Sequence, residues 1–335
     1  MNKIIKNLFF VYMLFVFVSS SAQTALNVIE NTITVSDIDK NLAFYTDNLK
    51  FEVQDTIEIK PETASKLFNI SQAEAQNKAI RLRLGNEHLI LQKFLNANGK
   101  PIPKDSKSND LWFQHIAIVV SDMDKAYGIL AKNRVQHVST SPQTLPDYIT
   151  AAAGIKAFYF RDPDNHNLEI IYFPKDKGNP KWQNKTSNVF LGIDHTAIGI
   201  SNTPESQKFY ETLGLKLAGK SENYGKEQEH LNQVFGARLE ISGFVAQKGI
   251  GVEFLDYIAP PGGRAYPSES KPTDLWHWHT TIEVNHLEDL HQKLIELDIE
   301  IISRSIVDLS ESYLKAQKAL MVRDPDGHAI LLIEK

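Results

Sequence analysis

The stretch DLWHWHTTIEV, residues 274–284, has a counterpart earlier in the chain, DLWFQHIAIVV at 110–120. Each copy places a histidine, His279 or His115, beside a run rich in Ile, Val or Thr, which is typical of a β-strand. A second pair of motifs, RDPDNH at 161–166 and RDPDGH at 323–328, lies at almost the same separation. Repetition at a fixed spacing predicts that the second half of the chain copies the first.

Each half also repeats within itself. The same strand position, six residues before a Ser or Asn, is taken successively by Glu30, His115, His195 and His279, at intervals of 85, 80 and 84 residues. Helix-capping residues follow each run and predict helices over 38–48, 122–133, 204–213 and 286–298. The Asp-Pro-Asp-Asn and Asp-Pro-Asp-Gly turns join the last two strands of the second and fourth copies. The chain is therefore expected to be an α+β protein made of four β-α-β-β-β modules.

The N-terminus predicts export. Lys3 and Lys6 precede the apolar run 8–18, and Ser20 and Ala22 then supply small residues before a cleavage point. This pattern is that of a secretory signal peptide over 1–22, and the apolar run is too short to span a bilayer comfortably. We expect a periplasmic or secreted protein with no stable membrane insertion after cleavage.

The remaining chain divides at a polar segment, 175–188, that is rich in Lys and Asn and contains Gly and Pro. We interpret this segment as a linker between two halves, 24–174 and 189–335, each of two modules. The total length of 335 residues is sufficient for two domains of ordinary size.

Composition excludes several kinds of site. The net charge is −5 and no basic cluster is present, so nucleic acid is not expected as a partner. The stretch GLKLAGKS at 214–221 matches a P-loop pattern, but a predicted helix precedes it where a P-loop needs a strand, so nucleotide binding is not expected. The chain has no cysteine, so any metal must be held by His, Asp or Glu. A homodimer is left open.

Tandem β-α-β-β-β modules, with a polar residue opening the first strand and Asp-Pro-Asp-(Gly/Asn)-His before the last, resemble the vicinal oxygen chelate superfamily. That family includes glyoxalase I, extradiol dioxygenases and bleomycin-resistance proteins. The resemblance covers nearly all of 26–335 and extends to LAFYTDNLKFEV, QKFYETLGLKLAG and VEFLDYIAPPGGR. It implies that paired modules curl into two open barrels, each able to hold a divalent metal, and that the ligand is a small molecule.

The family's metal ligands come from the first strand of each module and from a carboxylate on each fourth strand. The first-strand positions here are Glu30, His115, His195 and His279. The fourth-strand positions are Ile90, Glu169, Glu253 and Leu331, so two of the expected carboxylates are absent. The resemblance implies Fe, Mn, Ni or Zn as the metal.

The composition of a site depends on which modules pair. Pairing within each half gives one group of Glu30, His115 and Glu169, and a second of His195, Glu253 and His279. Pairing of the second module with the third gives a single complete set of His115, Glu169, His195 and Glu253. The predicted linker favours pairing within each half.

The resemblance favours a metal-dependent enzyme that chelates two adjacent substrate oxygens, either a glyoxalase-like lyase or isomerase or a dioxygenase. Glu253 or Glu169 is the expected proton carrier. Substrate contacts are expected from His230, Arg238 or Arg264, since the segment around 227–230 is expected to lie over the site. The alternative is a metal-free protein that sequesters a small molecule, which the apolar residues at two carboxylate positions favour.

Overall fold

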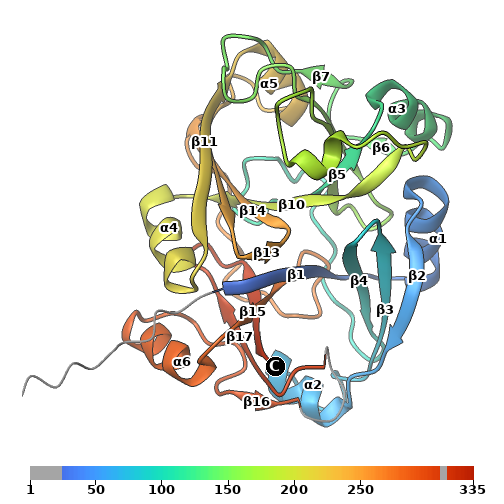
Figure 1. The fold of residues 1–335 in the computed structure, drawn as a ribbon. Helices are drawn as coiled ribbons and strands as arrows, with labels where there is room; N and C mark the ends of the chain where they lie inside the picture. Colours follow the sequence, from blue (N-terminus) through green and yellow to red (C-terminus); the bar gives the residue numbers. More distant parts are fainter. Residues whose placement is uncertain (1–24, 310–314) are drawn as a thin grey trace, which may run out of the picture.

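The computed structural model describes residues 25–309 and 315–335 (Figure 1). The predicted signal peptide, 1–22, lies outside the described residues. In the part of the chain that is described, no helix is both long enough and apolar enough to cross a membrane.

Two sheets of nine strands each form the body of the molecule. The first runs in the order β16 (Val307–Asp308), β17 (Lys318–Arg323), β18 (Ala329–Glu334), β15 (Trp278–Val284), β1 (Ala25–Thr34), β4 (Glu87–Phe94), β3 (Asn77–Leu84), β2 (Glu52–Ile57), with β13 (Lys248–Gly249) paired to β1. The second runs in the order β11 (Lys216–Tyr224), β12 (Arg238–Val245), β14 (Gly251–Ala259), β10 (Phe190–Ile200), β5 (Gln114–Val120), β9 (Asn167–Tyr172), β8 (Lys156–Arg161), β6 (Gln136–His137), with β7 (Gln143–Thr144) paired to β8.

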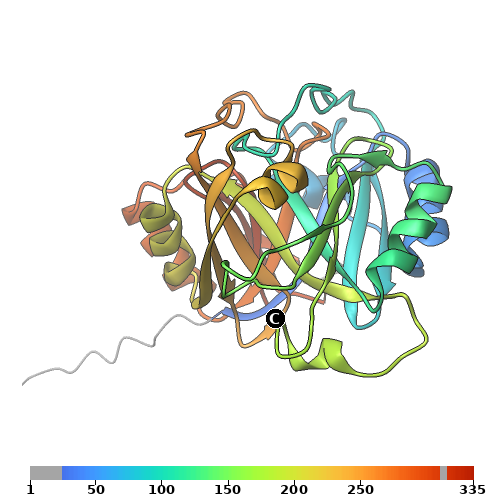
Figure 2. The same ribbon diagram turned by 90° about the horizontal axis from the view of Figure 1, so that it is seen from above.

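Four helices occupy the predicted positions. They are α1 (Ile38–Leu49), α3 (Met123–Lys132), α4 (Thr203–Thr212) and α6 (Leu287–Glu296). The side chains of Asp37, Asp122 and Asn202 accept a hydrogen bond from the first turn of α1, α3 and α4, which satisfies one of its free N–H groups. Figure 2 shows α1 and α3 on one flank of the sheets and α4 and α6 on the other. The fold class of four β-α-β-β-β modules in two open barrels is therefore confirmed.

Three shorter helices were not predicted. They are α2 (Pro61–Phe68), α5 (Lys226–Asn232) and the 3₁₀ helix η1 (Pro180–Gln183). The first two follow the second strand of the first and third modules, and η1 lies in the segment that we interpreted as a linker. Each of the three affects a barrel interior or a metal-ligand position, as described below.

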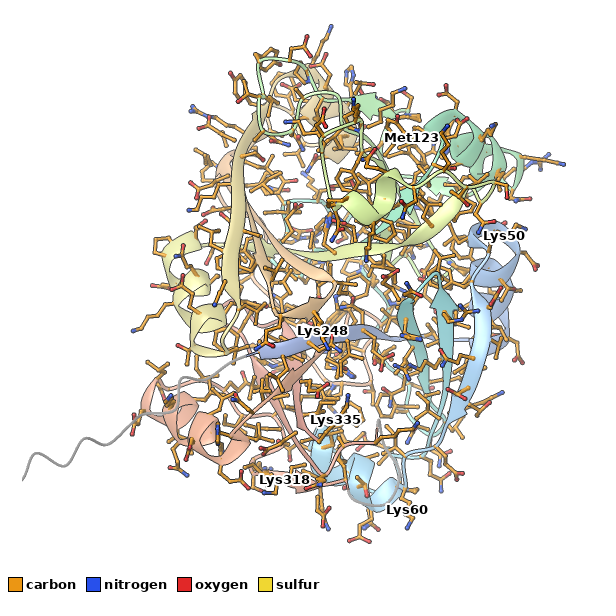
Figure 3. The ribbon with its side chains drawn as sticks, viewed as in Figure 1. Lys50, Lys60, Met123, Lys248, Lys318 and Lys335 are labelled. Atoms are coloured by element: carbon orange, nitrogen blue, oxygen red, sulfur yellow. The ribbon has the colours of Figure 1, made fainter. Side chains whose placement is uncertain are left out.

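The modules pair across the two halves of the chain. Antiparallel pairing of β10 with β5 sets Ala197 opposite His115, and antiparallel pairing of β1 with β15 sets Thr32 opposite His279. We call the two units the β5–β10 barrel, from the second and third modules, and the β1–β15 barrel, from the first and fourth. The expectation that each half closes its own barrel is wrong, because a polar segment between halves does not determine which strand edges meet. Strand β13 of the third module even pairs with β1, where Lys248 lies beside that strand (Figure 3).

The repeated Asp-Pro-Asp turns hold the two modules of each half together. Tyr45 of α1 donates a hydrogen bond of 3.1 Å to Asp162, and Tyr210 of α4 donates one of 3.2 Å to Asp324. All four side chains are buried, so these bonds are shielded from water. The turns therefore have a structural role, and the candidate ligand positions are those on the first and fourth strands of the modules.

Candidate metal centre

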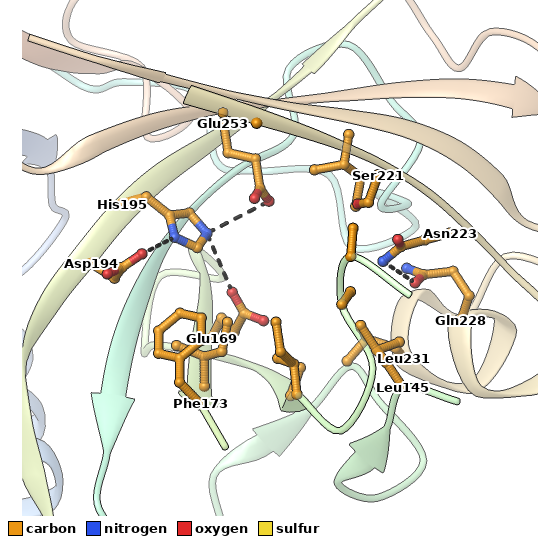
Figure 4. Close-up of a pocket in the computed structure, with 18 of the residues that line it drawn as sticks. Leu145, Glu169, Phe173, Asp194, His195, Ser221, Asn223, Gln228, Leu231 and Glu253 are labelled. Carbon is orange, nitrogen blue, oxygen red and sulfur yellow. Dashed lines mark hydrogen bonds and ion pairs between the residues drawn. The ribbon is translucent and has the colours of Figure 1, made fainter. Parts of the chain in front are cut away.

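Four side chains from four strands converge inside the β5–β10 barrel. His115 Nε2 lies 3.1 Å from Glu169 Oε2, and His195 Nε2 lies 3.8 Å from the same oxygen. Glu253 Oε1 lies 3.6 Å from His195 Nε2 (Figure 4). His115, Glu169 and His195 each offer a ligand atom within 4.8 Å of the others. This is the complete set that the alternative pairing predicted.

The strand register explains why these residues meet. Paired residues of neighbouring strands point to the same face of a sheet, and successive rows two residues apart share that face. The two rows are His195–Ala117–Glu169 and Glu253–Ala197–His115. An alanine at the centre of each row leaves room for the longer side chains on either side to approach one another.

The unpaired ring nitrogens make this cluster suitable for a divalent cation. His195 Nδ1 lies 3.0 Å from Asp194 Oδ2, while its Nε2 is buried without a hydrogen-bond partner among the described residues. His115 Nε2 is also buried, and its 3.1 Å contact with Glu169 Oε2 does not have the geometry of a hydrogen bond. An imidazole that donates one N–H to a carboxylate and keeps the other nitrogen free is arranged as metal-ligating histidines are. Two imidazoles and two carboxylates are a donor set for Fe, Mn, Ni or Zn.

The charges of the cluster agree with this assignment. Burial lowers the pKa of His195, but the carboxylates of Glu253, Asp194 and Glu169 outweigh burial and raise that pKa to about 10. Burial raises the pKa of Glu253, against the opposing effect of His195. The surplus of negative charge therefore holds a proton on His195, and a bound cation would replace that proton.

A cavity of about 300 Å³ opens beside the cluster, and Glu169, His195 and Glu253 form part of its wall. The remaining wall is apolar on one side and polar on the other (Figure 4). Its apolar lining is mainly Leu145, Ala152, Ile155, Ile171, Phe173 and Leu231. Its polar lining includes Ser221, Asn223 and Gln228. The volume and mixed lining suit a small molecule.

His279 lies outside this cluster, in the β1–β15 barrel. The predicted set of His195, Glu253 and His279 is therefore not assembled, because β15 pairs with β1 instead of β10. The His279 ring is fully buried with its centroid 6.0 Å from that of Phe68, and burial lowers its pKa to about 3. Glu30, in the same barrel, forms an ion pair of 2.6 Å with Arg81, so the first-half group of Glu30, His115 and Glu169 is also divided.

The three residues predicted to contact substrate do not line the cavity. Arg264 Nη2 lies 2.7 Å from Asp110 Oδ2, and Arg238 Nε lies 2.6 Å from Glu222 Oε1. His230 is exposed on α5. Helix α5 lies over the site as expected, because Gln228 and Leu231 line the cavity. These two residues are three apart and share a helix face, whereas His230 lies on the opposite, exposed face.

Two residues that support the site were not predicted. Asp194 orients His195 through the hydrogen bond with its Nδ1, and it also accepts a hydrogen bond from the indole N–H of Trp182. Trp182 belongs to η1, and its neighbour Lys181 forms an ion pair of 2.8 Å with Glu87 of the first module. An acidic residue directly before a ligand histidine is a signal that could have identified Asp194. Trp182 has no such signal, because its segment reads only as a linker.

Comparison with known proteins agrees with this fold. The model of the Glyoxalase/Bleomycin resistance protein/Dioxygenase superfamily matches residues 25–170 and 192–332. Glyoxalase I from Zea mays has a similar structure, with a TM-score of 0.61 and 16% identity over 93% of this chain and 92% of that one. A putative dioxygenase from Bacillus subtilis subsp. subtilis str. 168 gives a TM-score of 0.58 and 12% identity over 93% of this chain and 86% of that one. No curated protein matches the chain.

Proposed function

Because the chain belongs to the glyoxalase/bleomycin resistance protein/dioxygenase superfamily, we propose that it is a metal-dependent enzyme of that superfamily. It acts on a small molecule that presents two adjacent oxygens to the His115, Glu169, His195 and Glu253 centre. The observation that carries this proposal is the convergence of four donors beside a cavity, with the Nε2 atoms of both histidines buried and making no hydrogen bond to any residue that the structure describes.

The four side chains would hold Fe, Mn, Ni or Zn. Such an ion supplies Lewis acidity, which polarises a substrate carbonyl and makes the neighbouring carbon acidic. The protein contributes the fixed donor geometry, and Asp194 keeps the proton of His195 on Nδ1 so that Nε2 faces the site.

The two carboxylates differ in their access to substrate. The side chain of Glu253 is 26% exposed, whereas that of Glu169 is 5% exposed. Glu253 is therefore placed to take a proton from the carbon next to the carbonyl and to return it to the adjacent carbon, which is isomerase or lyase chemistry. Glu169 contacts both histidines and remains a ligand.

A dioxygenase activity is the second candidate within the same centre. Non-haem iron oxygenases use two histidines and one carboxylate with open positions, and this centre has the additional carboxylate of Glu253. The four-donor set therefore favours proton transfer over ring cleavage.

Export belongs to the proposal as well. The charged, apolar and small-residue segments of 1–22 support a secretory signal and a periplasmic or secreted location. A substrate outside the cytosol is then expected, which disfavours cytosolic glutathione adducts.

The test uses metal-stripped full-length protein reconstituted separately with Fe²⁺, Mn²⁺, Ni²⁺ and Zn²⁺. Each form is incubated with α-hydroxy ketones, hemithioacetals and catechols, with and without oxygen. Product formed without oxygen consumption, and lost in the Glu253→Gln variant, supports the isomerase or lyase. Oxygen consumption with catechol cleavage supports the dioxygenase. Absence of turnover with every metal and substrate class contradicts an enzyme of either kind.

A further inference from the structure

A chain of buried polar side chains runs from the cavity wall into the protein behind α5. Asn223 of β11 donates from Nδ2 to Gln228 Oε1 at 3.2 Å, and Gln228 donates from Nε2 to Asn232 Oδ1 at 2.5 Å. Asn232 donates in turn to the hydroxyl of Tyr257 in β14. The first three side chains are at most 3% exposed, so the network is shielded from solvent.

The network has a direction. Each amide uses its NH₂ group on the next member, so the side-chain carbonyl oxygens of Gln228 and Asn232 are already occupied. At the cavity end, Asn223 Oδ1 is buried and has no hydrogen-bond partner among the described residues. A rotation of this amide would set two NH₂ groups or two carbonyl oxygens against each other at Gln228. Rotation of the Asn223 amide alone is therefore excluded. Only a concerted reversal of all three amides, with Tyr257 donating its hydroxyl proton to Asn232 Oδ1, would present the NH₂ group of Asn223 instead of its free acceptor.

The backbone around α5 fixes this network in place. Ser108 Oγ donates to the carbonyl of Asn232 at 2.8 Å, and Ser139 Oγ donates to the carbonyl of Leu231 at 2.7 Å. Ser139 belongs to the second module and Ser108 to the segment that leads into it, whereas α5 belongs to the third module. The end of α5 is thus held at its main chain by residues outside the third module, which fixes the backbone that carries Leu231 and Asn232.

Asn223 and Gln228 lie across the cavity from His195, with the apolar lining between the two sides (Figure 4). A molecule bound by its oxygens at the metal ligands would therefore direct its other end towards Asn223 Oδ1. A buried acceptor left without a donor costs about 1–3 kcal/mol, so it discriminates between molecules that supply a donor and those that do not.

Resting on the proposed chelating function, we infer that Asn223 determines specificity, and that the substrate is a molecule with two adjacent oxygens at one end and a hydrogen-bond donor, a hydroxyl or N–H, at the other. The middle of the substrate is apolar, to match Leu145, Ile155 and Phe173.

The experiment measures the Kd of Zn²⁺-loaded protein for catechols by calorimetry, because the zinc form does not consume them by oxidation. The probes carry, at the 4-position, a hydroxyalkyl chain of one to four methylenes, an alkyl chain of equal length, or the methyl ether of the hydroxyalkyl chain. At one chain length, we expect the hydroxyalkyl probe to bind at least about tenfold more tightly than the alkyl probe. The ether accepts but does not donate, so it should bind no better than the alkyl probe.

Three variants locate the effect. Asn223→Leu removes the acceptor and should abolish the hydroxyl preference. Gln228→Leu frees the Asn223 amide to rotate, so the hydroxyl and ether probes should become nearly equal even if Asn223→Leu fails to fold. Asn31→Leu is the matched control, because Asn31 is a buried β1 residue that donates 2.9 Å to Thr280 and has a free Oδ1 outside the cavity. This variant should keep the preference.

A protein that does not chelate the substrate and a protein in which Asn223 does not determine specificity give different binding results. If His195→Ala does not weaken binding of any catechol, or none binds, the chelating function is contradicted and the inference falls with it. If binding depends on His195 but shows no hydroxyl preference at any length, or keeps the preference in Asn223→Leu, only the specificity assignment is overturned. Preference for the ether would show that Asn223 presents its NH₂ group, which also overturns it.

Discussion

The two barrels share one architecture but differ at the positions that face their interiors. In the β5–β10 barrel the two facing rows contain the four candidate metal donors separated by alanines. The equivalent rows of the β1–β15 barrel are Glu30–Thr281–Leu331 and Ile90–Thr32–His279. Apolar side chains replace both carboxylates there, and Glu30, which shares these rows with His279, is already paired with Arg81. The described residues therefore form no group of three metal donors around His279.

The inserted helices enlarge this difference. Helix α2 of the first module places Phe68 against His279 and joins an apolar cluster that includes Leu331 and Ile333. Helix α5, at the corresponding place in the third module, brings Gln228 to a cavity wall instead. One barrel is therefore filled, and the other holds a cavity whose lining is partly apolar and partly polar. The repeat preserves strand positions, whereas row partners and the inserted helix determine whether those positions form a site.

The largest expected effect is on turnover in the β5–β10 barrel. Glu253→Gln removes the proton carrier and should lower kcat by about 10²–10⁴-fold, the usual contribution of a positioned acid or base. Steady-state kinetics of the metal-loaded variant provides the measurement. Glu30→Gln changes the carboxyl of the other barrel and should leave kcat unaltered. Equal losses in the two variants would contradict the division of roles.

Phe68→Ala should affect only the filled barrel. It removes a fully buried ring and should lower the free energy of unfolding by about 3–5 kcal/mol, measured by urea denaturation. Phe235→Ala, at a position that is 92% exposed, should change it by less than about 0.5 kcal/mol. Bound metal should stay at the wild-type level in both variants. Loss of metal from Phe68→Ala would show that the filled barrel also holds a cation.

Acid should destabilise the filled barrel through His279. Its folded pKa is about 3 against an ordinary value of 6.5, so the unfolded chain binds a proton first and stability falls as pH drops below 6.5. Between pH 7.5 and pH 5 this residue should account for a loss of about 2 kcal/mol. The difference in unfolding free energy between wild type and His279→Leu, measured at both pH values, isolates this effect. A difference independent of pH would mean that His279 is hydrated.

The smallest effect is expected at the segment between the halves. Trp182→Phe removes the indole N–H that Asp194 accepts and should weaken metal binding about tenfold, the lower end of the range for a group that orients a ligand. Competition with a chromophoric chelator measures this affinity. Trp276→Phe removes an indole hydrogen bond to Ser270, away from the cavity lining, and should bind metal as wild type does. Equal metal affinities in the two variants would show that η1 does not support the metal site.

The repeat made most of the architecture predictable from sequence. The equivalent positions of His115, His195 and His279 predicted the module boundaries. Alignment of the fourth strands then predicted Glu169 and Glu253 as the carboxylate positions. Module pairing was not predictable, because both pairings satisfy the same hydrophobic pattern and connection lengths. The ligand set was therefore available only as one of two alternatives.

Supporting residues were harder to predict than ligands. Asn223 and Gln228 meet through the packing of α5 on β11, and no residue pattern announces that contact. Arg238 and Arg264 drew attention as cations, yet each is paired with a carboxylate, Glu222 or Asp110, on a neighbouring segment. The sequence shows that these two residues are charged, but only the tertiary fold shows which carboxylate neutralises each of them.

We expect the β5–β10 barrel to hold a metal and the β1–β15 barrel to hold none. Elemental analysis of full-length protein, purified without added chelator, tests this expectation with two matched variants. Wild type and His279→Ala should each contain about one equivalent of divalent metal per chain, and His195→Ala should contain almost none. Metal retained in His195→Ala, or lost from His279→Ala, would contradict this difference between the two barrels.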